Sequence, residues 1–133
     1  MLRAVADTHT IMWYLFGDDR LSLPARTLID EAAGAGEQVG FSAITVAEII
    51  YLMEKGRIKP ETLQRLLEAI DQRDAVLADV PFDRFVALAL RDVEKSKVPD
   101  LADRIIAATA LHLKVPLISR DRKVQLSNVS VVW

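Results

Sequence analysis

The sequence predicts an α/β fold, a three-layer sandwich in which a roughly five-stranded parallel sheet lies between helices. Short apolar runs alternate with longer helix-like segments along the whole chain, as expected for parallel strands joined by crossover helices. The runs Leu2–Ala6 and Pro116–Ser119 lack the polar alternation of half-exposed strands, which indicates strands covered on both faces. The length of 133 residues fits one domain, 1–133, with a sizeable core.

Each element follows from local signals. Strands are expected at Leu2–Ala6, Val39–Phe41, Ala75–Val80, Pro116–Ser119 and Ser130–Trp133. Helices are expected between them, at Thr10–Phe16, Pro24–Ala33, Thr45–Glu54, Pro60–Gln72, Phe82–Lys95 and Leu101–Leu113. Pro24 suits the first turn of its helix, and the stretches Gly34–Gly36 and Lys55–Gly56 are typical helix stops.

Composition excludes several classes of protein. Cysteine is absent, which rules out a disulfide framework, a thiolate metal site and a cysteine nucleophile; it is also consistent with a reducing compartment, and we expect a cytoplasmic protein. No uncharged apolar stretch reaches the roughly 18 residues of a membrane helix. Asp7 interrupts the first apolar run, so no signal peptide is expected. The net charge of −2 argues against binding nucleic acid by bulk charge alone but leaves local basic patches open.

Acidic residues stand beside apolar sequence, where an isolated carboxylate costs several kcal/mol unless it is neutralised, paired or bound to a metal. They are Asp7, Glu48, Asp100, Asp103 and Asp121. Asp7 and Asp121 follow predicted strands. Because sites in parallel sheets form beyond the carboxyl ends of the strands, both should open onto the same edge.

Each acid also has an ordinary explanation. Asp7 is a suitable N-cap, and Glu48 closes a pattern that matches a capping box; for these two, capping and ligation explain the sequence equally well. Asp100 can cap a helix whose macrodipole favours Asp103 in the first turn, although the apolar helix behind them favours a functional pair. Asp121 alone is best explained as part of a solvated turn.

If these acids converge at one edge, either some of them take up protons or a cation binds. Two carboxylates about 4 Å apart repel by about 1 kcal/mol in water and about 4 kcal/mol at an effective dielectric near 20. Several such pairs are large against a domain stability of about 5–15 kcal/mol. Oxygen ligands favour Mg²⁺ or Mn²⁺ over zinc. A carboxylate-held metal can activate water for phosphodiester cleavage, which suits a chain whose His9 and His112 indicate no catalytic triad.

The motifs resemble those of PIN-domain ribonucleases, and most closely the VapC-type toxins of prokaryotic type II toxin–antitoxin pairs. The matching segments are Ala6–His9, Thr45–Ile49, Asp100–Ala110 and Leu117–Asp121. Their order and spacing cover essentially the whole chain. The resemblance implies a parallel sheet between helices and metal-dependent cleavage of RNA that leaves a 5′-phosphate and a 3′-hydroxyl.

The resemblance also implies roles for single residues. It makes Asp7, Glu48 and Asp103 metal ligands, with Asp121 completing the catalytic quartet. Asp100 matches an additional acid of many relatives, which often read Asp-Pro-x-Asp-Arg; here the proline precedes Asp100. Two hydroxyl residues, Thr8 and Ser119, match positions that orient carboxylates or waters.

Partners are implied in the same way: an RNA substrate, a cognate antitoxin whose tail packs along helices near the pocket, and a second copy in a homodimer. Basic candidates for RNA contact are Arg104, Arg120, Arg122 and Lys123, for which a solvated surface is an equal explanation. Apolar candidates for a groove are Trp13, Phe16, Tyr51 and Met53, of which at least two are expected to serve core packing.

Three rival functions remain open from the sequence. Asp7–Thr10 resembles the Asp-x-Asp-x-Thr loop of haloacid dehalogenase-like phosphatases, but His9 stands where the second Asp belongs. A receiver-like phospho-acceptor domain would use Asp7 with a lysine after a late strand, for which Lys123 is the candidate. A catalytically silent binding module is the third rival.

Overall fold

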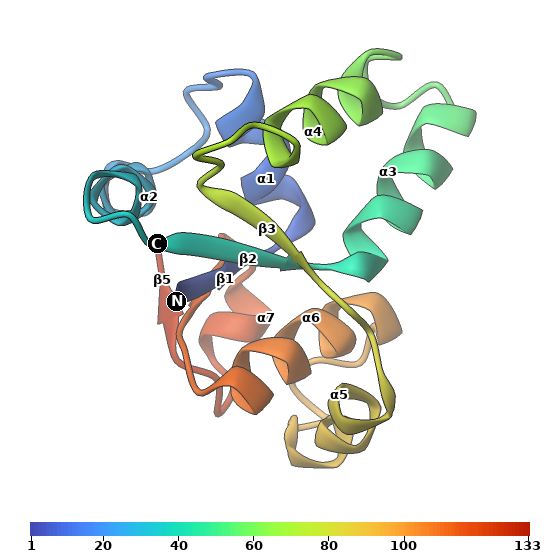
Figure 1. Cartoon of the computed structure of the whole chain (residues 1–133). Coiled ribbons are helices and arrows are strands. Elements are labelled where there is room, and N and C mark those ends of the chain that lie inside the picture. The colour runs from blue at the N-terminus through green and yellow to red at the C-terminus, as the bar shows by residue number, and fades with distance from the viewer.

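The computed structural model describes all residues from 1 to 133, and its centre is a five-stranded sheet (Figure 1). The strands are β1 (Leu2–Ala6), β2 (Gln38–Ser42), β3 (Leu77–Val80), β4 (Leu117–Ile118) and β5 (Val131–Val132). All neighbouring strands pair in parallel, in the order β3-β2-β1-β4-β5. The predicted α/β class and the parallel sheet are therefore confirmed.

Helices cover both faces of this sheet. They are α1 (Thr8–Leu15), α2 (Leu23–Gly34), α3 (Ala43–Glu54), α4 (Thr62–Ile70), α5 (Arg84–Ala89), α6 (Leu101–Leu113) and α7 (Arg122–Gln125), with a 3₁₀ turn at Leu90–Asp92. Figure 1 shows α1 to α4 on one side of the sheet and α5 to α7 on the other. None of these helices is long and apolar enough to cross a membrane.

The central strands are buried on both faces, as their continuous apolar sequence predicts. Along β1, Ala4 and Ala6 pack into the core under α1 to α4, whereas Val5 packs into the second core under α5 to α7. In β4, Ile118 and Leu117 divide between the same two cores. Successive side chains of a strand point to opposite faces, so these short strands hold the three layers together.

The sheet changes direction beside β1. The chain runs outward from β1 through β2 to β3 and then returns to the other side of β1 for β4 and β5. In an open parallel sheet, ligands bind outside the carboxyl ends of the strands at such a switch point. Here that point lies between the ends of β1 and β4, where Ala6 pairs with Ile118.

Several predicted boundaries were wrong. The first helix begins at Thr8 rather than Thr10, because the Asp7 side chain caps it by accepting the Thr10 backbone N–H at 2.9 Å. The predicted helix Phe82–Lys95 is only α5 and the 3₁₀ turn, since Asp83 caps it later and regular helix ends at Ala89.

The capping box in the third predicted helix was also wrong. This helix, α3, is capped by Ser42 and begins at Ala43, so Glu48 lies near its middle and cannot reach the free N–H groups of the first turn. Its carboxylate therefore needs another explanation.

Candidate metal centre

Acids from four separate segments lie at the carboxyl edge of the sheet, on both sides of the switch point. Asp7 directly follows β1, and Asp121 is the third residue after β4. Asp100 and Asp103 stand at the start of α6, and Glu48 lies on α3, which begins directly after β2. In Figure 1 the arrowhead of β2 points to the side on which α3 begins. The sheet thus directs these segments toward one edge.

Asp103 lies at the electrostatic centre of this group. The pKa of its carboxyl is raised from 3.8 to about 6, first by burial and then by the negative charges of Asp100, Asp121, Glu48 and Asp7, in decreasing order. A like charge perturbs a carboxyl in this way only from nearby. The raised pKa of Asp103 is thus consistent with the other four acids lying near it.

Part of this group surrounds a small hollow. Asp100, Asp103 and Asp121 line a space of about 250 Å³ together with Lys123 and the chain at Val98–Pro99. Asp7, Glu48, Asp103 and Asp121 are partly buried, whereas Asp100 is exposed. Asp100 thus sits at the rim, and its main visible role is to cap α6 by accepting the Asp103 backbone N–H at 3.0 Å.

Two buried hydroxyls hold Glu48 beside the end of β1. Thr8 Oγ1 donates to Glu48 Oε1 at 2.6 Å, and it also lies 3.0 Å from Thr45 Oγ1. Thr8 and Thr45 are 4% and 0% exposed. The contact of Glu48 is therefore with the segment that carries Asp7, and the predicted orienting role of Thr8 has a direct structural counterpart.

Ser119 organises the segment of Asp121 instead of touching its carboxylate. Its buried Oγ accepts the Asp121 backbone N–H at 3.1 Å, and its carbonyl accepts Gln125 Nε2 at 3.2 Å. The Asp121 side chain caps α7 by accepting the Lys123 N–H at 2.9 Å. These bonds fix the turn that brings Asp121 to the edge of the sheet.

The donor set suits a hard divalent cation. Each of Asp7, Asp100, Asp121 and Glu48 uses only one carboxylate oxygen in the hydrogen bonds above, which leaves the other oxygen for a ligand. Asp103 accepts no hydrogen bond through its side chain. In the conformation seen, no three His, Asp or Glu side chains lie close enough together to hold one ion. The chemistry of the donors matches Mg²⁺ or Mn²⁺, and binding requires rotation of the free carboxylates.

The predicted basic residues divide into two groups. Arg104 is partly buried, and its Nη2 donates to the Leu90 carbonyl at 2.7 Å, so it ties α6 to the 3₁₀ turn. Arg120, Arg122 and Lys123 are exposed. Only Lys123 lines the acidic hollow.

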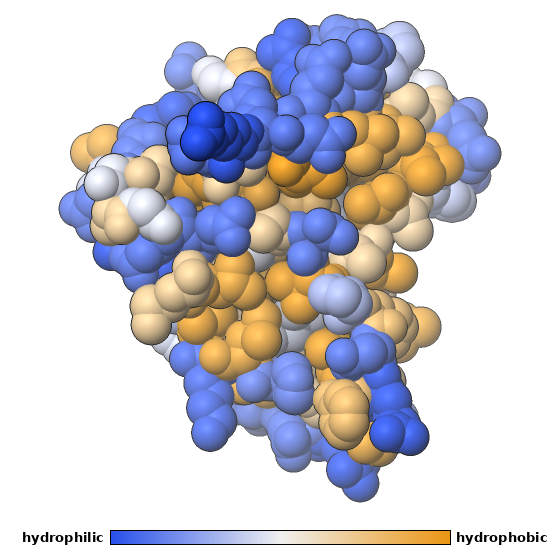
Figure 2. Space-filling model, viewed as in Figure 1, coloured by the Kyte–Doolittle hydropathy of each residue, from blue (hydrophilic) through white to orange (hydrophobic).

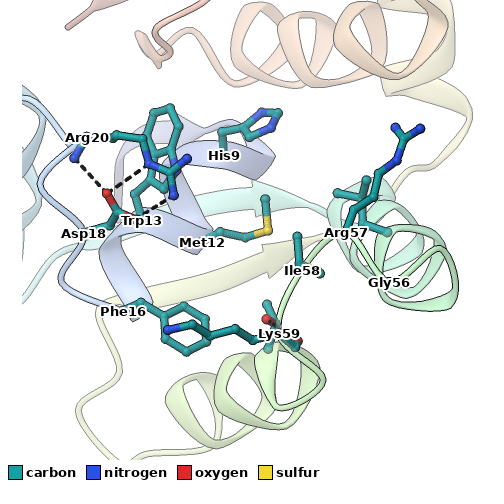
Figure 3. A pocket seen from close by; sticks show the side chains of 12 residues that line it. His9, Met12, Trp13, Phe16, Asp18, Arg20, Gly56, Arg57, Ile58 and Lys59 are labelled. Carbon is teal, nitrogen blue, oxygen red and sulfur yellow. Dashed lines mark hydrogen bonds and ion pairs between the residues drawn. The ribbon is translucent and has the colours of Figure 1, made fainter.

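A larger cavity of about 690 Å³ lies between α1, the loop after α3 and the start of α4 (Figure 3). In Figure 3, Met12 and Ile58 point toward one another in this cavity, with His9 and Lys59 at its margins. His9, two residues after Asp7, connects the cavity to the acidic edge. Sequence analysis missed it, although the alternating cations Lys55, Arg57 and Lys59 were a local signal.

Cations cover the aromatic residues around this cavity. The guanidinium groups of Arg20 and Arg120 lie 5.3 and 5.7 Å from the Trp13 ring centroid. Lys59 and Arg65 each lie 4.6 Å from that of Phe16. The acid in the lining, Asp18, is bound to Arg20.

The predicted apolar groove residues do not all serve one surface. Trp13 is 8% exposed and belongs to the core, and Met53 packs against that core. Phe16 lines the cavity, whereas Tyr51 is 55% exposed on α3. The expectation that at least two of the four serve core packing is thus confirmed. His112 is exposed on α6, as expected for a surface residue.

The sequence and the fold are similar to those of known proteins. Over 125 residues the chain is 27% identical to ribonuclease VapC22 of Mycobacterium tuberculosis, covering 94% of this chain and 92% of that protein. The fold matches VapBC2 of Rickettsia felis, solved with a promoter DNA fragment, with a TM-score of 0.70, 14% identity and coverage of 98% and 97%. It also matches a toxin–antitoxin complex from Klebsiella pneumoniae, with a TM-score of 0.62, 22% identity and coverage of 98% and 96%.

The sequence profile of the PIN domain matches residues 4–131, nearly the whole chain and every acidic segment described above. This match argues against the haloacid dehalogenase-like and receiver-like alternatives, which require different folds around Asp7. The chain belongs to the PIN domain family.

Proposed function

We propose that this protein is a Mg²⁺- or Mn²⁺-dependent endoribonuclease, and that it is the toxin of a toxin–antitoxin module. The observation that supports the proposal is the position of four acids beyond the ends of the strands: Asp103 and Asp121 line one hollow, and Thr8 joins Glu48 to the segment of Asp7. Membership of the PIN domain family and the similarity to ribonuclease VapC22 support the choice of RNA.

In this proposal the four partly buried acids hold the cation, and exposed Asp100 assists from the rim. A bound divalent cation supplies an activated water and stabilises charge on the phosphate. Thr8 holds Glu48 in place, and Ser119 holds the turn that carries Asp121. Three exposed cations close in sequence to Asp121 would contact RNA phosphates: Arg120, Arg122 and Lys123. Arg104 is assigned to the fold instead.

The test is cleavage of end-labelled RNA by the purified protein with Mg²⁺ or Mn²⁺. We expect internal cuts that leave a 5′-phosphate and a 3′-hydroxyl, and loss of cleavage when a chelator removes the metal. A matched control is Asp19→Asn, which changes an exposed acid on the loop after α1. Cleavage that persists in the chelator, or that survives in Asp7→Asn, would exclude the proposed chemistry.

The proposed antitoxin would occupy the large cavity beside α1 and α4. The toxin–antitoxin complex from Klebsiella pneumoniae supports a protein partner. The cavity combines the apolar surface of Met12, Leu52 and Ile58 with the cations Arg57 and Lys59. Its complement is an extended segment that presents apolar and acidic side chains.

We also propose a homodimer that uses apolar side chains on α3, α5 and the chain beside them. Exposed residues there include Ile50, Tyr51, Phe82, Phe85 and Leu88, with exposed fractions from 40% to 55%. Figure 2 shows apolar residues gathered over the positions of α3 and α5 in this view. Exposed apolar area of this kind is typical of an interface between proteins.

A further inference from the structure

The two buried hydroxyls beside Glu48 are linked to it by consecutive hydrogen bonds, and the donor and acceptor of each bond can be deduced. Thr8 Oγ1 has a single proton, and it donates that proton to Glu48 Oε1 at 2.6 Å. An ionised carboxylate can only accept. The 3.0 Å contact between Thr8 and Thr45 must therefore have Thr45 Oγ1 as the donor and Thr8 Oγ1 as the acceptor.

Thr45 differs from two other helical threonines, which bond a carbonyl close to them in the sequence. The buried Thr109 of α6 donates to the Ile105 carbonyl one turn earlier, at 2.7 Å, and Thr62 donates to the Lys59 carbonyl at 2.7 Å. Such back-bonding is the ordinary local partner of a helical hydroxyl. The Thr45 side chain is 0% exposed, and the only hydrogen-bond partner of its hydroxyl in the protein is the Thr8 hydroxyl.

We infer that Thr45 is a positioning residue for the metal centre: it donates to Thr8 and thereby holds the Thr8 hydroxyl toward Glu48. Consecutive hydrogen bonds polarise one another in a buried site. The chain joins two segments, because Thr45 and Glu48 lie three residues apart on α3, whereas Thr8 directly follows Asp7. It therefore fixes Glu48 relative to Asp7 and leaves Glu48 Oε2 free. The inference rests on the proposed function only for its consequence at the metal.

Two substitutions at Thr45 distinguish the effect of its hydroxyl from the effect of its packing. Thr45→Val keeps the shape of the side chain but removes the donor, and Thr45→Ser keeps the donor but removes the methyl group. Thr109→Val is the matched control, since it removes an equally buried hydroxyl that donates only to the Ile105 carbonyl.

The first measurement needs no metal. In metal-free protein, the carboxyl ¹³C resonance of Glu48 is expected to move in Thr45→Val, to stay near its wild-type position in Thr45→Ser, and not to move in Thr109→Val. If the Glu48 carboxyl resonance does not move in Thr45→Val, the inference is overturned. This result is independent of whether the protein is a nuclease.

The second measurement is the Kd for Mn²⁺ by calorimetry, with the melting temperature of each metal-free variant. Outer-shell partners of metal ligands are worth about 10- to 100-fold in affinity, so we expect Thr45→Val to weaken Mn²⁺ binding by about 10-fold. Thr45→Ser should stay within about twofold of the wild type. In a Glu48→Gln background, Thr45→Val should add no further loss.

The outcomes distinguish the proposed nuclease function from the positioning role inferred for Thr45. If wild-type protein neither binds Mn²⁺ nor cleaves RNA, the proposed function is wrong, and the carboxyl resonance still decides the hydroxyl chain. If wild-type protein binds Mn²⁺ but Thr45→Val lowers only the melting temperature, Thr45 is structural and the inference fails. Equal losses in Thr45→Ser, which keeps the donor, and in Thr45→Val would assign the effect to packing at this position rather than to the hydroxyl, and would also refute the inference.

Discussion

Removing one acid from the centre of the site should make the metal-free protein more stable. The perturbation is Asp103→Asn, which deletes the carboxylate whose pKa is raised to about 6 by burial and by the other four acids. An acid with a raised pKa in the folded state binds its proton more tightly there than in the unfolded chain. Its contribution to stability is therefore present at low pH and is lost as the pH rises from about 4 through about 6.

The magnitude follows from the size of this change. A rise from 3.8 to about 6 corresponds to at most about 3 kcal/mol, at about 1.4 kcal/mol for each pH unit. Asp103 is partly exposed, and solvent screening reduces this to about 1–2 kcal/mol. Asparagine also loses the favourable interaction of a negative charge with the first turn of α6, which is worth about 0.3–1 kcal/mol. The net gain at about pH 7.5 is then about 1 kcal/mol.

Thermal unfolding in a chelator measures this gain. For a domain of this length, about 1 kcal/mol corresponds to a rise of roughly 3–5 °C in melting temperature. The difference between Asp103→Asn and wild type should shrink as the pH falls toward about 4, where both states protonate the acid. Asp19→Asn, which changes an exposed acid, is the control and should show no such pH dependence.

Two results would refute this reasoning. If Asp103→Asn were less stable than wild type at neutral pH without metal, the acids would not repel one another as the structure implies. A gain in stability that stayed constant with pH would show that it arises from packing, since it would not follow the titration of Asp103.

Further predictions concern the metal and the partners. Asp7→Asn should abolish cleavage and keep the folded circular dichroism spectrum; full activity would remove Asp7 from the site. Mn²⁺ at about 100 times its Kd should stabilise the wild type by about 2.7 kcal/mol, and an unchanged melting curve would count against the site. Arg57→Glu should weaken antitoxin binding about 10-fold at low salt and less at high salt, as titration calorimetry would show. Phe85→Lys should convert a dimer to monomers in sedimentation, whereas Leu23→Lys, exposed on α2, should not.

The sequence predicted the parts of the site that depend on topology. Apolar strands without alternation required a sheet buried on both faces, and a parallel sheet gathers the residues that follow its strands at one edge. The positions of Asp7 and Asp121 at this edge were predicted, since each follows a strand beside the switch point. The pair at the start of α6 was likewise evident from an apolar helix preceded by acids.

The parts that failed depend on where helices begin and on contacts between distant segments. Thr45-x-x-Glu48 matched a capping box, but Ser42 is a better-placed cap and starts α3 earlier. The four-residue helix α7 is too short to show helical periodicity. Arg104 looked like a free surface cation, whereas its partner is the carbonyl of Leu90, fourteen residues earlier. No local pattern records such a contact.

Capping and metal ligation are not competing explanations of these acids. A carboxylate has two oxygens, and Asp7, Asp100 and Asp121 each give one of them to a backbone N–H at the start of a helix. That bond holds the side chain beside the end of a strand or helix and leaves the second oxygen free. Asp103 caps nothing, and its pKa is raised by burial and by the charges of the other four acids. The fold therefore uses the caps to fix the acids at one edge, and the repulsion that results is what a divalent cation would relieve.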